Sequence, residues 1–374
     1  MANQIALEIR KLSRHIHNLK VLTLCGGTPF KPQVLSLSHG AHIIVATPGR
    51  VLKHIEQNNI DLENINTLVL DEADKMLDMG FYDDIMSIIN TLPTKRQTLL
   101  FSATYEKNIE KLASNVLLNP VVVKVENEEK VHIKQEFYYI DEENKTAFIP
   151  ALISSNKAKS ILIFCNMKIK CDKLADDLYA LGLDVLTLHS DLEQKQRDET
   201  IILFSNKSYP ILIATDVASR GLHIDDVDLV INYDLSLDEK IHTHRIGRTA
   251  RAGKGGLAIS LYTQNDFDRV EIIKETFSDI EDKSIDSVED DLSYKIDSEL
   301  RTIFINGGKK QKLRAGDILG ALTAGIGLQK DDIGKIDILD FASYVAINKE
   351  KISFVLERLS KEKIKGKYYR IYEK

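Results

Sequence analysis

The chain has 374 residues, 43% hydrophobic and 28% charged, which is enough for two or three domains with buried cores. Its net charge of −6 argues against a generic polycation, and no apolar run approaches the roughly 20 residues that span a bilayer. Cys25, Cys165 and Cys171 lack C-x-x-C spacing, which argues against zinc and disulfide frameworks and favours a reducing cytoplasm.

Short apolar strands alternate with amphipathic helical patterns over the first 275 residues or so. The expected strands, in chain order, are 21–24, 42–46, 67–70, 97–101, 160–164, 185–188, 210–214, 229–232 and 256–261. Such alternation is typical of parallel sheets covered by helices on both faces. A polar stretch near residues 126–134 divides the series, so we expect two α/β domains, at 1–126 and 136–277.

The remaining third of the chain has a different character. Residues 278–297 are rich in Asp and Glu and indicate a solvated acidic linker. From about residue 300 the order becomes strand, helix, strand, strand, helix, strand, which predicts a ferredoxin-like βαββαβ domain of the RNA-recognition type at 298–374. Residues 297–374 hold 16 Lys and Arg against 11 Asp and Glu, a positive excess typical of nucleic-acid binding.

Three carboxylates, those of Asp71, Glu72 and Asp74, follow the third expected strand directly. The carboxyl edge of a parallel sheet is where open α/β proteins bind ligands. An Asp at this edge can hold Mg²⁺ through water, because Mg²⁺ prefers hard oxygen ligands and keeps much of its hydration shell. The adjacent Glu can orient and deprotonate an attacking water. A bare Asp-Glu pair is more often a solvated loop, but the nine-residue run 69–77 is far more specific.

The run V-L-D-E-A-D-K-M-L at 69–77 resembles motif II of the DEAD-box RNA helicases. A Gly-Gly pair, a T-P-G-R segment and an S-A-T turn occur around it in the family's order. The resemblance implies that Ser102 and Thr104 hydrogen-bond the acidic cluster and couple nucleotide hydrolysis to domain closure. Glycines permit close backbone approach, and N–H groups at a helix start attract phosphate. The implied RNA contacts in this half are Gly26, Gly27, Thr47, Pro48, Gly49 and Arg50.

The second half contains H-R-I-G-R-T-A-R at 244–251, which resembles the family's motif VI. The resemblance assigns Arg248 and Arg251 to the transferring phosphate, which a planar guanidinium can bind through two hydrogen bonds. His244 and Arg245 would bridge to the first half. Residues 163–166 resemble motif IV, and Gln194 with the Arg three residues later resembles the family's Q-x-x-R segment.

Residues 214–222 resemble motif V, which lies on RNA phosphates and the nucleotide ribose. The resemblance implies RNA contacts from Thr215 and Arg220 and nucleotide contacts from Gly221 and His223. The family usually has Asp at the position of His223. An imidazole can hydrogen-bond a ribose hydroxyl but is not a carboxylate acceptor, so this contact departs from the family's pattern.

The carboxyl-terminal domain narrows the resemblance from the DEAD-box family as a whole to one type within it. Residues 302–310 and 314–322 are similar to the RNA-binding domain of DbpA-type helicases. The resemblance implies docking on a hairpin of large-subunit ribosomal RNA during ribosome assembly. A basic cluster that attracts phosphate comprises Lys309, Lys310, Lys312 and Arg314. Tyr344 is the main candidate for base stacking, with packing inside the sheet as an equal alternative. We expect RNA binding by basic edges and loops rather than by the sheet face.

The sequence contains no G-x-x-x-x-G-K-[ST] loop to cradle phosphates. In the family this loop precedes a P-T-R-E-L-A-x-Q stretch, whose last residues the start of the chain resembles. The pattern indicates a helicase whose amino end is missing through a misplaced start codon, a split gene or a real truncation, so that its first RecA-like domain is incomplete. We expect a cytoplasmic, monomeric ATP-dependent RNA helicase that uses ATP and Mg²⁺ and has no membrane partner. The alternative is an ATPase-dead RNA-binding fragment.

Overall fold

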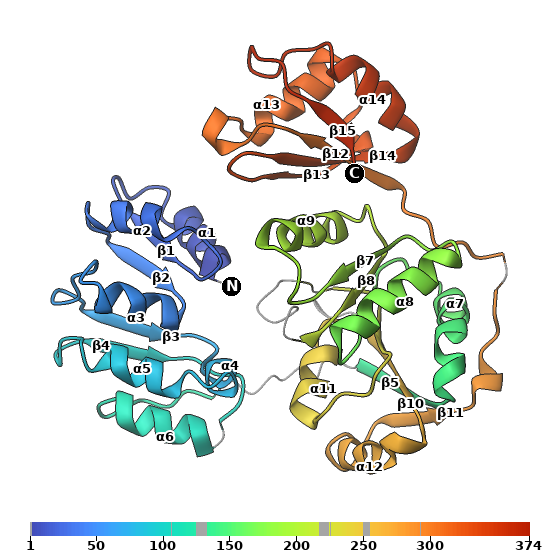
Figure 1. Ribbon diagram of the computed structural model, residues 1–374, viewed down its shortest axis with the longest axis horizontal. Helices are drawn as coiled ribbons and strands as arrows, with labels where there is room; N and C mark the ends of the chain where they lie inside the picture. Colours follow the sequence, from blue (N-terminus) through green and yellow to red (C-terminus); the bar gives the residue numbers. More distant parts are fainter. Residues whose placement is uncertain are drawn as a thin grey trace. The chain divides into compact units, whose positions relative to one another are not determined.

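A computed structural model of the chain describes residues 2–105, 107–124, 133–216, 224, 226–249, 255–291 and 293–374. The chain forms two compact units, Met1–Glu126 and Asn127–Lys374 (Figure 1). Among the described helices, none is long and apolar enough to cross a membrane.

The first unit contains two separate two-stranded parallel sheets, β1 with β2 and β3 with β4. Helices cover one face of the β3–β4 sheet, where Leu70 packs with Ile85 and Leu112. Because side chains alternate along a strand, Val69 and Leu99 point to the opposite face, where they are 50% and 37% exposed. The elements are α1 (Ala2–Leu12), β1 (Val21–Leu24), α2 (Phe30–Leu37), β2 (Ile43–Ala46), α3 (Pro48–Glu56), β3 (Thr67–Leu70), α4 (Ala73–Asp78), α5 (Tyr82–Ile89), β4 (Gln97–Leu100) and α6 (Lys107–Val116).

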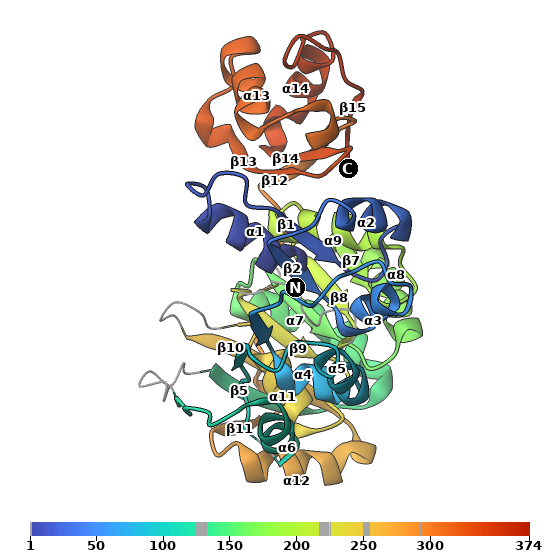
Figure 2. The ribbon, with the colours of Figure 1, turned by 90° about the vertical axis from the view of Figure 1, so that its left-hand side faces the viewer.

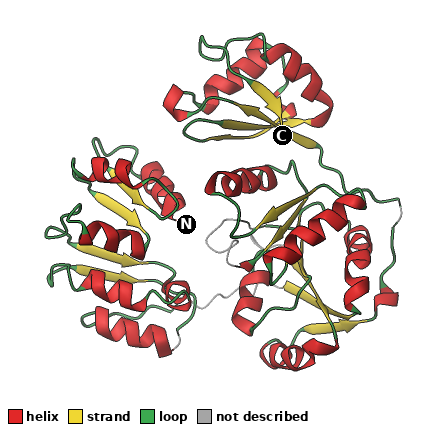
Figure 3. Ribbon diagram, viewed as in Figure 1, coloured by secondary structure: helices red, strands yellow, loops and turns green. Residues whose placement is uncertain are grey.

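The second unit begins with a parallel sheet of strand order β11-β5-β10-β9-β6-β8-β7, with helices on both faces (Figure 3). Strand β6 shows why both faces are covered: Ile161 and Ile163 belong to one buried cluster, and Leu162 and Phe164 to another. This confirms the predicted parallel α/β class. The elements are β5 (Ile133–Tyr139), α7 (Lys145–Asn156), β6 (Ile161–Phe164), α8 (Lys168–Ala180), β7 (Val185–Leu188), α9 (Gln194–Ser205), β8 (Ile211–Ala214), β9 (Leu229–Asn232), α11 (Glu239–Ile246), β10 (Gly256–Tyr262), α12 (Phe267–Thr276) and β11 (Ile280–Lys283).

Two strands of this sheet lie where the sequence predicted polar connections. β5 begins inside the expected divider, and β11 occupies part of the expected linker at 278–297, pairing in parallel with β5. Lys134 and Lys283 form ion pairs with Glu136 at 2.9 and 2.6 Å, and these pairs neutralise charge on the acidic edge. The solvated-linker prediction was therefore wrong for 280–283. The following segment also packs on the domain, since the Tyr294 hydroxyl donates to the Ala158 carbonyl at 2.8 Å.

The carboxyl-terminal domain is an antiparallel sheet of order β13-β14-β12-β15. Helices α13 and α14 lie on one face of it, as Figures 1 and 2 both show. This order and the βαββαβ succession confirm the predicted RNA-recognition-type fold. The elements are β12 (Leu300–Ile305), α13 (Ala315–Gly320), β13 (Ile333–Ile338), β14 (Ser343–Asn348), α14 (Ile352–Leu359) and β15 (Ile371–Glu373).

Candidate nucleotide and RNA site

The acidic cluster occupies the turn between β3 and α4. Glu72 adopts φ 50° and ψ 50°, a left-handed conformation that is uncommon for a residue with a side chain and often marks functional turns. The backbone N–H of Ala73 donates to the Phe101 carbonyl at 3.0 Å, which ties this turn to the end of β4. Glu72 Oε1 pairs with Lys75 Nζ at 2.8 Å. Glu72 Oε2 is buried without a hydrogen-bond partner among the residues that the structure describes.

Asp74 links the acidic turn to the S-A-T turn. The carboxylate of Asp74 is buried, and its Oδ2 accepts hydrogen bonds from the backbone N–H groups of Ala103 at 3.2 Å and Thr104 at 3.3 Å. The Thr104 hydroxyl lies 3.5 Å from the same oxygen. The Ser102 hydroxyl instead donates to the Thr104 carbonyl at 2.6 Å. Backbone amides therefore make most of the link that the sequence assigned to two hydroxyls.

The donor set at this turn suits a hydrated Mg²⁺. Asp71 is exposed, and its Oδ1 accepts only the neighbouring Glu72 N–H, at 3.0 Å, among the contacts described. No group of three or more metal-binding side chains occurs in the described part of the chain. Mg²⁺ is commonly held by one or two carboxylates together with substrate phosphates and waters, so a lone exposed Asp fits that ion. The unpartnered Glu72 Oε2 is suited to accept a hydrogen bond from water.

The two expected RNA-contacting loops of the first unit lie side by side because β1 and β2 pair in parallel. Gly26 and Gly27 are exposed after β1, and Thr47 precedes Pro48 at the first turn of α3. The Arg50 guanidinium donates to the Thr28 carbonyl at 3.1 Å, which joins the second loop to the first.

Two buried residues that the sequence analysis missed complete this junction. Gln33 Oε1 accepts from Arg50 at 3.0 Å and lies 3.0 Å from His54 Nε2, while Gln33 Nε2 donates to Thr28 Oγ1 at 2.7 Å. The His54 ring stacks on Phe30, with ring centroids 4.2 Å apart. Burial, with the charge of Arg50, lowers the pKa of His54. Nothing in the hydrophobic pattern distinguishes these residues, because a buried Gln on a helix resembles an exposed one in sequence.

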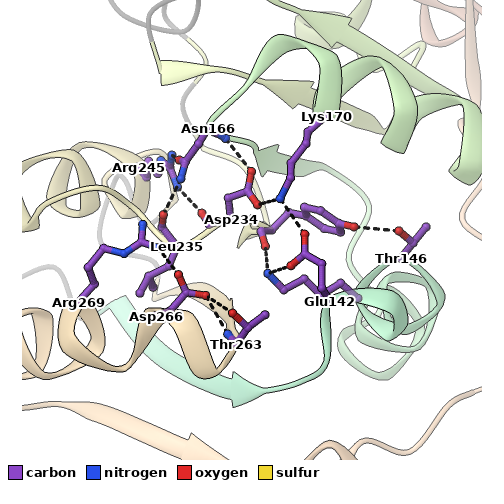
Figure 4. Close-up of polar contacts among 12 residues, drawn as sticks. Glu142, Thr146, Asn166, Lys170, Asp234, Leu235, Arg245, Thr263, Asp266 and Arg269 are labelled. Carbon is purple, nitrogen blue, oxygen red and sulfur yellow. Dashed lines mark hydrogen bonds and ion pairs between the residues drawn. The ribbon is translucent and has the colours of Figure 1, made fainter.

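Arg245 lies inside the second unit, with only 1% of its surface exposed (Figure 4). Its Nε and one terminal nitrogen donate to the two carboxylate oxygens of Asp216, both at 2.7 Å. Its other N–H groups reach Asn166 Oδ1 at 2.6 Å, Asn232 Oδ1 at 3.3 Å and the Asp234 carbonyl at 2.7 Å. All five donors of the guanidinium are thus occupied within one domain. The role of His244 and Arg245 as a bridge to the first half stays a prediction.

The other motif residues of the second unit lie around α11. Arg248 follows this helix, and its Nε donates to the His244 carbonyl at 3.2 Å. Thr215, an expected RNA contact, is buried at the end of β8, and its N–H donates to the Leu188 carbonyl at 3.1 Å. Four expected site residues lie outside the described residues: Arg220, Gly221, His223 and Arg251.

The basic cluster of the carboxyl-terminal domain is exposed at all four positions, Lys309, Lys310, Lys312 and Arg314. Gly308 lets this turn lie against the sheet, since an added Cβ would collide with the Leu339 carbonyl. Lys365 Nζ donates to the Lys312 carbonyl at 2.6 Å, which brings a second basic turn beside the cluster.

Two aromatic residues of this domain differ in solvent exposure. Tyr368, which the sequence analysis did not single out, is 63% exposed with Lys363 over its ring. Tyr344 is 1% exposed, which favours the packing alternative over base stacking.

Comparisons with known proteins agree with this organisation. Residues 1–112 match the DEAD/DEAH box helicase model, 144–253 the helicase conserved C-terminal domain and 302–373 the DbpA RNA binding domain. The chain is 43% identical over 372 residues to the ATP-dependent RNA helicase DbpA of Escherichia coli, covering 99% of this chain and 81% of the relative. It is 36% identical over 394 residues to the DbpA of Bacillus subtilis, covering 99% and 82%.

Among solved structures, Saccharomyces cerevisiae Dbp5 bound to RNA and ADP BeF3 is similar with a TM-score of 0.66. The identity is 28%, over 76% of this chain and 75% of that chain. The motifs, the two parallel-sheet domains and the carboxyl-terminal domain lead to one conclusion: the chain belongs to the DEAD-box ATP-dependent RNA helicases of the DbpA type.

Proposed function

We propose that the protein couples ATP hydrolysis to local remodelling of RNA duplexes, on large-subunit ribosomal RNA during ribosome assembly. The observation that carries the proposal is the acidic turn: Asp74 joins it to the S-A-T turn, and Glu72 keeps one carboxylate oxygen without a described partner. The family uses ATP and acts on RNA. We also propose that the protein is cytoplasmic and monomeric.

In this proposal Asp71 holds Mg²⁺ through water and Glu72 orients and deprotonates the attacking water. Arg248 and Arg251 stabilise charge on the transferring phosphate, as arginine fingers do in other phosphate-transferring enzymes. Mg²⁺, when bound, would neutralise negative charge on the phosphate oxygens. Phosphoryl transfer depends almost entirely on positioning and charge stabilisation, so these groups act only on a phosphate that is held in place.

A second candidate function is RNA binding without ATP hydrolysis. The 374 residues contain no G-x-x-x-x-G-K-[ST] loop, and such a loop supplies the amides and the Lys that cradle the phosphates. A protein made of these residues alone is therefore expected to bind RNA without turnover. A form that also carries the loop is expected to hydrolyse ATP.

Ribosomal RNA as the target is supported by the match of 302–373 to the DbpA RNA binding domain and by its exposed basic cluster. Replacing Lys309, Lys310 and Lys312 with Ala in the full chain should weaken binding to a structured ribosomal RNA hairpin. Each lost phosphate contact reduces the slope of log K against log salt by about 0.7 to 0.9, so the loss of three contacts should flatten the slope by about two to three units. Fluorescence anisotropy over a salt series measures this change.

The matched control replaces the same three residues with Arg, which keeps the charge and should keep the slope. Equal slopes for the Ala and Arg variants would place the RNA surface elsewhere on the chain. Equal affinity for the ribosomal hairpin and an unrelated hairpin would contradict ribosomal RNA as the target.

A further inference from the structure

The two faces of the carboxyl-terminal sheet have different partners. Because side chains alternate along a strand, Ile303 and Val345 point to α13 and α14, where they lie in the domain core. Phe304 and Tyr344 point to the opposite face, and their rings make an edge-to-face contact with centroids 5.3 Å apart. Tyr372 adds a third ring, 4.7 Å from Phe304. Aromatic residues on this face are the ones that stack bases in typical RNA-recognition domains.

In this chain, helix α9 of the preceding domain covers Phe304 and Tyr344 on that face, while Tyr372 at its edge stays 37% exposed. Ile202 of α9 forms one buried apolar cluster with Phe304, Ala342 and Tyr344. Ile202 and Phe304 are each 8% exposed, and Tyr344 is 1% exposed. Rings sealed to this degree by a neighbouring helix are not available to stack on bases.

Buried hydrogen bonds beside the apolar cluster fix the register of the contact. The hydroxyl oxygen of Thr302 on β12 accepts from Asn206 Nδ2 at 2.8 Å and lies 2.7 Å from Ser208 Oγ. Thr302, Asn206 and Ser208 are between 0% and 3% exposed. If the domains separated, these three polar groups would lose their hydrogen-bond partners or would have to bind water instead. Leaving a buried polar atom without a partner costs free energy.

Charged groups close the rim of the same contact. The Arg301 guanidinium donates to the Ser208 carbonyl at 3.0 Å and to Asp184 at 2.8 Å. Glu199 of α9 forms an ion pair with Lys374 and accepts from the Tyr344 hydroxyl at 3.4 Å. The contact therefore has an apolar centre and a polar rim, the anatomy of a specific interface.

We infer that the sheet face of the carboxyl-terminal domain is a docking surface for α9 and not an RNA-binding surface. Helix α9 begins at Gln194, in the segment that resembles the family's Q-x-x-R. The docking residues lie in its second half, at Glu199 and Ile202, and just after its end, at Asn206 and Ser208. One helix thus connects a helicase RNA segment to the accessory domain. RNA held by the exposed cluster Lys309–Arg314 is presented in a fixed position relative to the second helicase domain. The RNA part of this inference rests on the proposed function, whereas the docking part does not.

A designed disulfide tests the inference in the full chain. Ser208→Cys with Thr302→Cys replaces two hydroxyl oxygens 2.7 Å apart with sulfurs, which bond at about 2 Å with little backbone movement. Ser208→Cys is nearly isosteric and Thr302→Cys removes a single buried methyl group, so the fold should persist with a modest loss of stability. Mild oxidation should link these residues in most molecules, as measured by peptide mapping under non-reducing conditions. The control pair, Ser208→Cys with Ser360→Cys, places the second thiol after α14 on the helix side of the sheet and should stay reduced.

The linked protein should bind a structured ribosomal RNA hairpin with the affinity of its reduced form and an unchanged salt slope. Failure of the 208–302 link to form, or equal linking of the control pair, would overturn the docking. A loss of RNA affinity of about tenfold or more on linking, reversed by reduction, would show that RNA uses the sheet face. Efficient linking in a protein that binds no RNA in either state would support the docking and contradict the proposed RNA function instead.

Discussion

At the scale of single residues, the structure shows contacts that the motifs did not predict, both for an expected site residue and for residues outside the motifs. Asp74 holds the S-A-T turn through backbone amides, and Gln33 with His54 joins the two expected RNA loops. The functional roles that the motifs imply stay predictions, and the motifs did not predict the contacts that hold these residues in place. Arg245 illustrates the reason: its acceptors are distant in sequence, so its burial depends on tertiary packing that a motif does not encode.

The buried guanidinium of Arg245 leads to the first prediction. Arg245→Lys keeps the charge but cannot satisfy Asp216, Asn166 and the Asp234 carbonyl together, because an ammonium lacks the planar fork. Breaking a buried pair costs about 3 to 5 kcal/mol, and we expect a loss near the lower figure because the charge remains. Urea unfolding of the second unit measures it. The control Arg358→Lys, at an exposed position on α14, should stay within about 0.5 kcal/mol of the parent. Equal stability of the two variants would contradict the role given to Arg245.

The buried imidazole of His54 gives a pH dependence. Its pKa in the folded state is lowered from 6.5 by burial and by Arg50, so the unfolded chain binds the proton more readily. The contribution to stability is therefore full above about pH 6.5 and is lost as the pH falls from there through the lowered pKa of the folded state. Urea unfolding at pH 8 and pH 5 should show a larger loss for the parent than for His54→Gln, which keeps a donor but does not titrate. Identical pH profiles would show that His54 is not held neutral in the fold.

At the scale of elements, the alternation of short strands and amphipathic helices predicted the parallel sheets and the βαββαβ order of the last domain. The strands β5 and β11 escaped prediction because their acidic residues are neutralised by lysines from the paired strand, as Glu136 is by Lys283. The docking face of α9 also could not be predicted. Asn206 and Ser208 have the composition of a solvated helix end, and they are buried where they hydrogen-bond Thr302 of the partner sheet.

The sheets of the first unit lead to a prediction about local stability. The strands β6, β8 and β9 of the second unit are buried along their whole length, whereas β3 and β4 leave Val69, Leu99 and Phe101 exposed on an open face. Elements with little buried apolar surface open most readily. Limited proteolysis should therefore cut within 2–124 well before 133–291, as followed by mass spectrometry of the fragments. Equal resistance of the two regions would contradict this expectation.

At the scale of the whole molecule, the proposed function divides its tasks among separate parts of the chain. The acidic turn of the first unit and the arginines after α11 carry the proposed chemistry, while the last domain carries the exposed basic cluster. Composition alone indicated this division, because the positive charge is concentrated after residue 297. The docking of the last domain on α9 could not be predicted from the sequence. It depends on which face of the sheet is left uncovered by the domain's own helices.

The measurement that tests the central claim most directly is RNA-stimulated phosphate release by a chain extended at its amino end with a segment bearing a G-x-G-K-T loop. The extended chain should hydrolyse ATP in response to ribosomal RNA. Glu72→Gln should lower this rate by at least about 100-fold through loss of the general base, while Asp78→Asn, an exposed acid in the next helix, should leave it unchanged. The 374 residues alone should bind the RNA without turnover. Glu72-dependent, RNA-stimulated hydrolysis by those 374 residues, or an extended chain indifferent to Glu72→Gln, would contradict the account.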